Sequence, residues 1–130
     1  MNRKKIAPSP ALVVAGLLLL TMNLMAQDPV KLAPDKLNVI LENDTVRVFE
    51  ARLKPGEKLG MHSHPKSLAY FMSSFRLKST FPDGRSVIIE KKPGDILWRE
   101  PVRHSEENVG TTDLVVLVLE FKTFNPSEKK

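Results

Sequence analysis

From Leu37 onward, apolar residues come in short runs that turn residues separate, without the long 3.6-residue period of a helix. Residues 45–53 mix β-branched and charged residues with partial alternation, and Lys54-Pro55-Gly56 ends the run. The run at 114–121 is almost wholly apolar and β-branched, which predicts a strand buried on both faces. The pattern indicates about eight to ten short strands, and hence an all-β sandwich or barrel.

Turn residues mark the boundaries of the later strands. Asp83-Gly84, within residues 81–85, suits a tight hairpin turn with positive φ. The β-rich stretch at 68–81 is expected to break near Ser73-Ser74, and residues 92–95 turn again. Further strands are expected at residues 86–90, 96–99 and 104–108.

Residues 1–26 have the layout of a secretory signal peptide, with a basic start, the apolar run 11–20 and Ala26 as a possible cleavage point. The sequence therefore predicts an exported protein, periplasmic or secreted, without stable membrane association once the segment is removed. The alternative is a retained anchor, although the strongly apolar run is about half the roughly 20 residues that a spanning helix needs.

The remaining chain divides into three parts. Residues 27–41 contain two prolines in their first ten positions and are expected to form a linker or N-terminal arm, 42–124 the folded domain, and 125–130 a polar tail. A chain of 130 residues with 42% hydrophobic content suits one domain with a modest core.

Charge and cysteine content exclude several classes of function. The chain carries 20 Lys and Arg and 15 Asp and Glu. Three of the basic residues and none of the acidic ones lie in residues 1–26, so the chain after residue 26 has 17 basic and 15 acidic residues and a formal charge of +2. No basic stripe interleaved with aromatic residues indicates nucleic-acid binding. The absence of cysteine excludes disulfides, thiolate ligands and a cysteine nucleophile.

All three histidines lie in two short stretches. His62 and His64 are two apart, so in a strand their side chains share one face. His104 follows about 40 residues later in another expected strand. Three imidazoles brought together form a nitrogen-rich site for a divalent metal, and iron, manganese, zinc, nickel and copper all accept such ligands.

These two stretches resemble the motifs of a small single-domain cupin. Gly56, His62 and His64 match the first cupin motif in type and spacing, and the second motif is matched with one extra residue by Gly94, Pro101, His104 and Asn108. The resemblance covers about residues 42–122. It implies a cupin double-stranded β-helix, or jelly-roll, barrel with one metal ion held by the three histidines.

The chain departs from the cupin pattern where the first motif has a glutamate, because Leu68 and Ala69 stand there. Three neutral imidazoles leave a divalent ion its full charge of +2 and open positions for substrate. We therefore expect an anionic or oxygen-rich ligand. Two motif glycines are also absent, near Ser74 and near Val102, which suggests altered turns.

The catalytic residues are unknown from the sequence. Tyr70 would share a face with Leu68 and is a weak candidate proton donor, although a packed core tyrosine is the stronger interpretation. Arg99 and Arg103 are weak candidates for holding an anion.

Other residues near the motifs have structural interpretations. Trp98 is interpreted as a core or rim residue and Asn108 as a residue that fixes a turn. Three glutamates are weighed as a fourth ligand and interpreted as solvated charges, namely Glu57, Glu106 and Glu107.

Two classes of function follow from these expectations. The first is a metal-dependent enzyme, of the dioxygenase, isomerase or lyase type, that acts on a small molecule. The second is a non-catalytic cupin module that binds or senses a metal or small ligand, because no general base is evident beside the histidines. Since cupin barrels often pair through sheet edges, a homodimer is expected.

Overall fold

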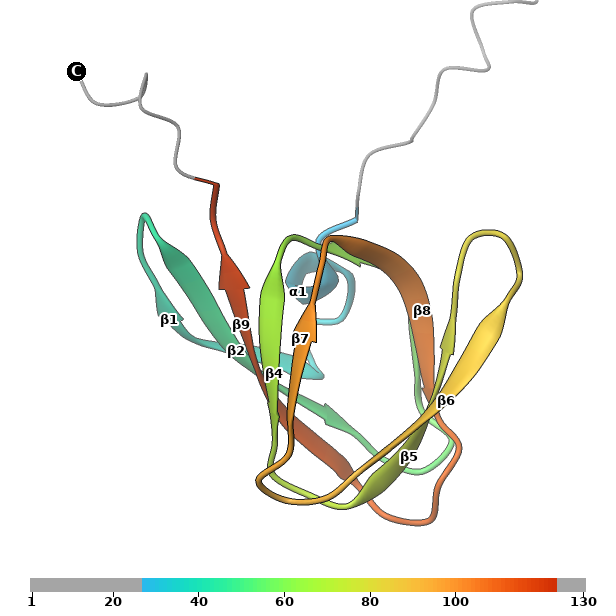
Figure 1. The fold of residues 1–130 in the computed structure, drawn as a ribbon. Helices are drawn as coiled ribbons and strands as arrows, with labels where there is room; N and C mark the ends of the chain where they lie inside the picture. Colours follow the sequence, from blue (N-terminus) through green and yellow to red (C-terminus); the bar gives the residue numbers. More distant parts are fainter. Residues whose placement is uncertain (1–26, 124–130) are drawn as a thin grey trace, which may run out of the picture.

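The protein forms two antiparallel sheets that face each other, as the alternating sequence pattern predicts (Figure 1). This computed structural model describes residues 27–123. Its elements in chain order are α1 (Pro29–Leu32), β1 (Leu37–Glu42), β2 (Val46–Leu53), β3 (Lys58–His64), β4 (Ser67–Phe71), β5 (Phe75–Thr80), β6 (Ser86–Lys91), β7 (Ile96–Arg99), β8 (Val102–Asn108) and β9 (Leu114–Phe121).

One sheet has five strands in the order β1-β2-β9-β4-β7, and the other has four in the order β3-β8-β5-β6. The strand break near Ser73-Ser74 and the turn at 81–85 are both found, with Gly84 at φ 85° in the hairpin that joins β5 to β6. The predicted all-β jelly-roll class is therefore confirmed.

The core consists of side chains that point from both sheets into the space between them. Phe49 and Leu53 of β2, Phe71 of β4 and Leu77 of β5 are almost completely buried there. Burying such side chains supplies the main favourable free energy of folding, about 1.5–3 kcal/mol for each.

The two-sided burial predicted for residues 114–121 is wrong, because β9 alternates between fully and partly buried positions. Its outward side chains lie on the outer face of the five-stranded sheet.

A β-bulge in β3 sets which residues face the interior. The register against β8 shifts between Leu59 and His62, so that Leu59, His62 and His64 all point inward although Leu59 is three residues before His62. Gly60 and Met61 lie in this irregularity. Without the shift, the strand could not turn both its core leucine and its two histidines to the same side.

Residues 27–41, expected to form a linker or N-terminal arm, include α1 and most of β1. Asp28 caps α1 through a 3.0 Å bond from the Val30 amide, and Pro29 occupies the first turn, where a missing amide proton costs nothing. Helix α1 packs against β1 and β3, and Leu37 of β1 is buried in the core. The two prolines therefore begin a helix and form a turn, and do not keep the segment extended.

The predicted signal segment, 1–26, and the predicted polar tail, 125–130, lie outside the described residues. Within residues 27–123, no helix is long and apolar enough to cross a membrane.

Candidate metal centre

The three histidines meet inside the barrel, as their positions in the sequence predict. His62 and His64 come from β3, His104 comes from β8, and His62 is paired directly with His104 across the two strands. Their ring centroids lie 4.8 to 5.3 Å apart, and all three side chains are buried. One ligand nitrogen from each histidine lies within 4.8 Å of the others.

Each imidazole is held from behind through its Nδ1 atom. His62 Nδ1 lies 2.7 Å from the carbonyl oxygen of Gly60, in the β3 bulge. His64 Nδ1 lies 2.6 Å from Oε1 of Glu120, and His104 Nδ1 lies 2.9 Å from the hydroxyl of Ser79. Partners of this kind fix the orientation of metal-binding histidines in proteins. The three Nε2 atoms are therefore the ring nitrogens that remain available to bind a common metal ion.

The contact between His62 and His64 favours a cation between their rings. A carbonyl and a carboxylate only accept hydrogen bonds, so both Nδ1 atoms must donate, and in the neutral rings both Nε2 atoms carry lone pairs. These two Nε2 atoms lie only 3.0 Å apart. Burial lowers the pKa of His62, which opposes protonation at neutral pH. A metal ion would satisfy both lone pairs.

His104 completes the same arrangement. Its Nε2 is buried and has no hydrogen-bond partner among the described residues. Burial is the main cause that lowers the pKa of this imidazole to about 4. The ring is therefore neutral at physiological pH and able to act as a ligand. The donor set thus fits a divalent ion.

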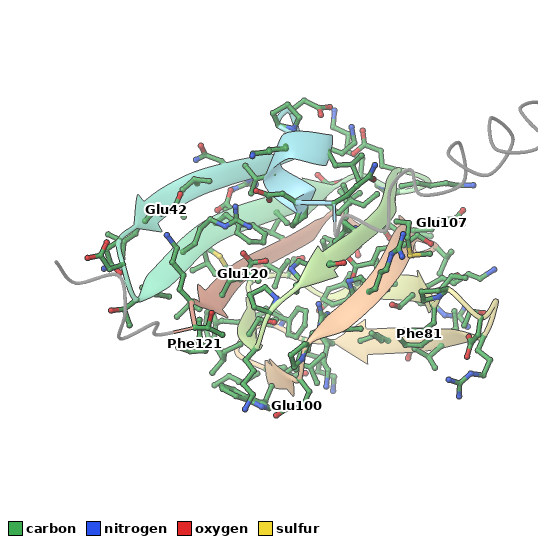
Figure 2. All side chains as sticks on the ribbon, turned by 90° about the horizontal axis from the view of Figure 1, so that it is seen from above. Glu42, Phe81, Glu100, Glu107, Glu120 and Phe121 are labelled. Atoms are coloured by element: carbon green, nitrogen blue, oxygen red, sulfur yellow. The ribbon has the colours of Figure 1, made fainter. Side chains whose placement is uncertain are left out.

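Glu120 connects this centre to the start of the domain. It projects inward from β9, is buried, and accepts from Arg47 as well as from His64. Arg47 also pairs with Asp28, the cap of α1, at 2.8 Å. The carbonyl of Gln27 accepts from the Ser63 amide, between the two β3 histidines. In Figure 2, Glu120 lies in the middle of the molecule, whereas Glu42 and Glu107 lie toward its periphery.

Glu106 lies beside the histidines, which the sequence interpretation did not foresee. It was expected in solvent, but its side chain is only 9% exposed, and its oxygens lie 3.7 Å from His104 Nε2 and 4.0 Å from His62 Nε2. Its spacing carries a signal, because a residue two positions after His104 shares the inward face of β8. Glu57 and Glu107 stay at the surface, as expected.

Arg99 lies beside the centre, whereas Arg103 does not point into the barrel. Arg99 projects inward from β7, with its Nη2 3.8 Å from Oε1 of Glu106. Arg103 occupies the other face of β8, opposite Ser63. Of the two arginines, Arg99 is the one beside Glu106, whereas Arg103 lines an outer pocket that also reaches His64.

Space around the histidines is unequal on the two sides. The cavity on the core side is lined by His62, His64, Arg99, Glu106 and apolar residues and has a volume of about 20 Å³, enough for about one water. A pocket of about 310 Å³ opens on the side of His104, lined by Arg99, Ser79, Phe81 and Ile89. A second open pocket, of about 590 Å³, reaches His64 between Arg47 and Arg103. A ligand larger than water can therefore approach from these open sides and not from the core.

Comparison with solved structures shows which fold family has this architecture. A cupin domain from Bordetella pertussis Tohama I shares 30% identity, with 67% of this chain and 92% of that one covered and a TM-score of 0.62. The chain belongs to the cupin superfamily. A cupin superfamily protein from Desulfitobacterium hafniense has a TM-score of 0.53 at 16% identity over 67% of this chain and 76% of its own, which shows the shared fold. An RmlC-like cupin from Methanocaldococcus jannaschii has a TM-score of 0.54 at 15% identity, covering 65% and 77% of the two chains.

Neither protein-family models nor curated proteins matched the sequence. The cupin assignment therefore rests on the solved structures and carries no substrate with it.

The weak candidate Tyr70 lies on the wrong side of this cupin barrel to act at the centre. Leu68 and Tyr70 face outward from β4, and Tyr70 is 41% exposed. Trp98 is also on the outer face, where its ring lies 5.5 Å from that of Phe121. The parity that was expected to bring Tyr70 inside depends on Leu68 facing inward, and Ala69 takes that orientation instead.

Asn108 fixes a turn, as expected. Its side-chain amide donates to the carbonyls of Leu53 and Thr112, and its oxygen accepts from the Gly110 amide. Its bonds hold the end of β8 in place and do not reach the histidines.

Proposed function

We propose that this cupin binds one divalent metal ion through His62, His64 and His104 and is a metal-dependent enzyme for a small oxygen-donor molecule. The observation that carries the proposal is the convergence of three Nε2 atoms whose rings are each held through Nδ1. Such an ion, when bound, would polarise and orient an oxygen donor. Reactions of the dioxygenase, isomerase or lyase type are the candidates.

Arg99 and Glu106 supply the other chemistry that an enzyme needs. Arg99 lines the open pocket and offers a fixed positive charge for a carboxylate or enolate group of the substrate. Glu106 is a carboxylate within 4 Å of two histidine nitrogens, so a group able to accept a proton lies beside the centre. The core-side cavity is too small for substrate, so binding would take place in an open pocket, and the pocket on the His104 side is the one that Arg99 lines.

Export is part of the proposal and depends on residues 1–26. The layout of that segment supports a cleaved signal, with a retained anchor as the alternative. Fractionation of cells that express the full chain, with mass analysis of the mature N-terminus, tests it.

The first experiment is metal analysis of protein purified without a histidine tag, beside a His62→Ala/His64→Ala variant. About one metal per chain, lost in the variant, supports the proposal and names the element. A wild-type protein that is empty and also refuses added metal contradicts it. Iron would direct the work to oxygen-uptake assays, and zinc or manganese to lyase and isomerase screens.

A non-catalytic binding or sensing module is the second candidate, because such a module needs only the three histidines and an open pocket and no proton-transferring group. Turnover by metal-loaded protein, lost in His64→Ala, decides for the enzyme. Saturable binding of small oxygen donors without turnover across a broad panel decides for the module.

A further inference from the structure

The strand that carries the glutamate ligand in the cupin pattern cannot supply one here. Ala69 of β4 has the inward orientation and lines the cavity beside His62 and His64. A methyl group offers no donor to a metal. Leu68, the other residue at the motif position, faces the outer side of the sheet.

Strand β8 places a carboxylate in the same cavity. Glu106 lies two residues after His104, so both side chains point inward, and both are buried. The closest contacts of its oxygens to neighbouring ionisable groups, to His104, Arg99 and His62, measure 3.7, 3.8 and 4.0 Å. All three are longer than a hydrogen bond. A buried carboxylate without a close partner is costly, and a cation would remove that cost.

The separations suit two ligands of one ion. Nitrogen and oxygen ligands bind transition metals at about 2.0–2.2 Å, so two ligands of the same ion lie about 3–4 Å apart. The Nε2 atoms of His62 and His64 are 3.0 Å apart, and the Glu106 oxygens lie 3.7 and 4.0 Å from the histidine nitrogens. The Glu106 oxygens therefore lie at the separation expected between ligands of one ion from two of the three histidines.

We infer that Glu106 is a fourth protein ligand of the metal, relocated from β4 to β8. The inference rests on the proposed function, because it requires that the three histidines bind an ion. With this carboxylate the protein gives the ion a net charge of +1, so the ligand need not be an anion to balance the site. The anionic substrate expected from the absent motif glutamate then loses its main electrostatic reason, and a neutral oxygen donor becomes an equal candidate.

The test compares Glu106→Gln with Glu107→Gln. Both remove one negative charge from neighbouring positions of β8, but Glu107 points away from the histidines toward Lys58. Zn²⁺ affinity is measured by competition with a chromogenic chelator on the full chain without a histidine tag. We expect Glu106→Gln to bind at least about 100-fold more weakly, because even outer partners of a ligand cost 10–100-fold, and Glu107→Gln to stay within about threefold.

Two results separate the inference from the proposed function. Wild-type protein that binds no Zn²⁺ overturns the proposed function. Wild-type binding with equal affinity in Glu106→Gln overturns the relocated ligand and leaves the three-histidine site standing.

A spectroscopic measurement covers the case in which Glu106→Gln does not fold. Glu106→Asp keeps the charge and shortens the side chain, so a ligating carboxylate must change its geometry. A change in the visible absorption of the Co²⁺-loaded Glu106→Asp protein relative to wild type supports the inference. A spectrum identical to that of the wild type overturns it.

Discussion

Oε1 of Glu120 lies 2.6 Å from Nδ1 of His64, and Arg47 holds the same carboxylate from its other side. The pair joins β9 of one sheet to β3 of the other through side chains alone. Because the carboxylate can only accept, it fixes His64 in the tautomer whose Nε2 is free to bind a metal.

Glu120→Gln is expected to lower metal affinity about 10–100-fold, since a neutral amide holds the ring less firmly and can present its NH₂ group to it. Chelator competition with Zn²⁺ measures the change. Glu42→Gln, at an exposed residue of β1 that pairs with Lys122, is the matched control and should bind as wild type does. Unchanged affinity in Glu120→Gln would show that His64 needs no such support.

Moving the carboxylate back to β4 should restore binding. In Glu106→Ala/Ala69→Glu, the added side chain enters the cavity that the removed one leaves, because both positions line it. We expect Glu106→Ala alone to lose about 100-fold or more in Zn²⁺ affinity and the double variant to recover at least tenfold. Thermal unfolding of each metal-free variant checks that the barrel is intact. A folded double variant that binds no better than Glu106→Ala contradicts the expectation.

The metal-free protein should lose stability as the pH falls from 6.5 to about 4. His104 titrates near 6.5 in the unfolded chain and at about 4 in the folded protein. In this interval the unfolded state binds a proton that the folded state does not, so the free energy of unfolding decreases as the pH decreases. The loss from His104 is about 3 kcal/mol at most and levels off below its folded pKa, and His62 acts in the same direction.

Urea unfolding at several pH values measures this dependence. The His104→Gln variant, which lacks the titrating group, should show a smaller change. Equal stability of the metal-free wild type at pH 7 and pH 4.5 would contradict the argument.

The homodimer expected from the sequence remains a prediction, and the structure offers a face for it. Directly paired residues share one face of a sheet, and one outward row across all five strands is apolar. Its members are Leu41, Val48, Leu119, Leu68 and Trp98. The outward face of an antiparallel sheet is usually polar, so a row of this kind suits contact with a second copy.

Trp98→Lys should shift the protein toward monomer in sedimentation velocity. Val87→Lys, at a residue of β6 in the other sheet that is similarly exposed, should leave the distribution unchanged. A wild-type protein that sediments as a monomer at high concentration contradicts the dimer.

The sequence predicted the features that depend on residue spacing and on the alternation of side chains along a strand. His62 and His64 share a face because they are two apart in a strand, and the cupin resemblance brought His104 to them. The strands and the hairpin at Asp83-Gly84 followed from turn residues, since Gly84 adopts the positive φ that such turns require.

What the sequence did not reveal depends on contacts between distant residues. Ser79 and Glu120 lie 25 and 56 residues from the histidines that they hold. Glu106 was assigned to solvent because most glutamates are exposed, although its spacing from His104 placed it inside. The short helix at Pro29–Leu32 was missed because a single turn shows no helical period.

The bond between the Gln27 carbonyl and the Ser63 amide has a consequence for the mature chain that the sequence predicts. It fixes Gln27, the first described residue, beside the β3 position that lies between His62 and His64. Cleavage after Ala26 would therefore place the new amino terminus next to the strand that carries two of the three histidines.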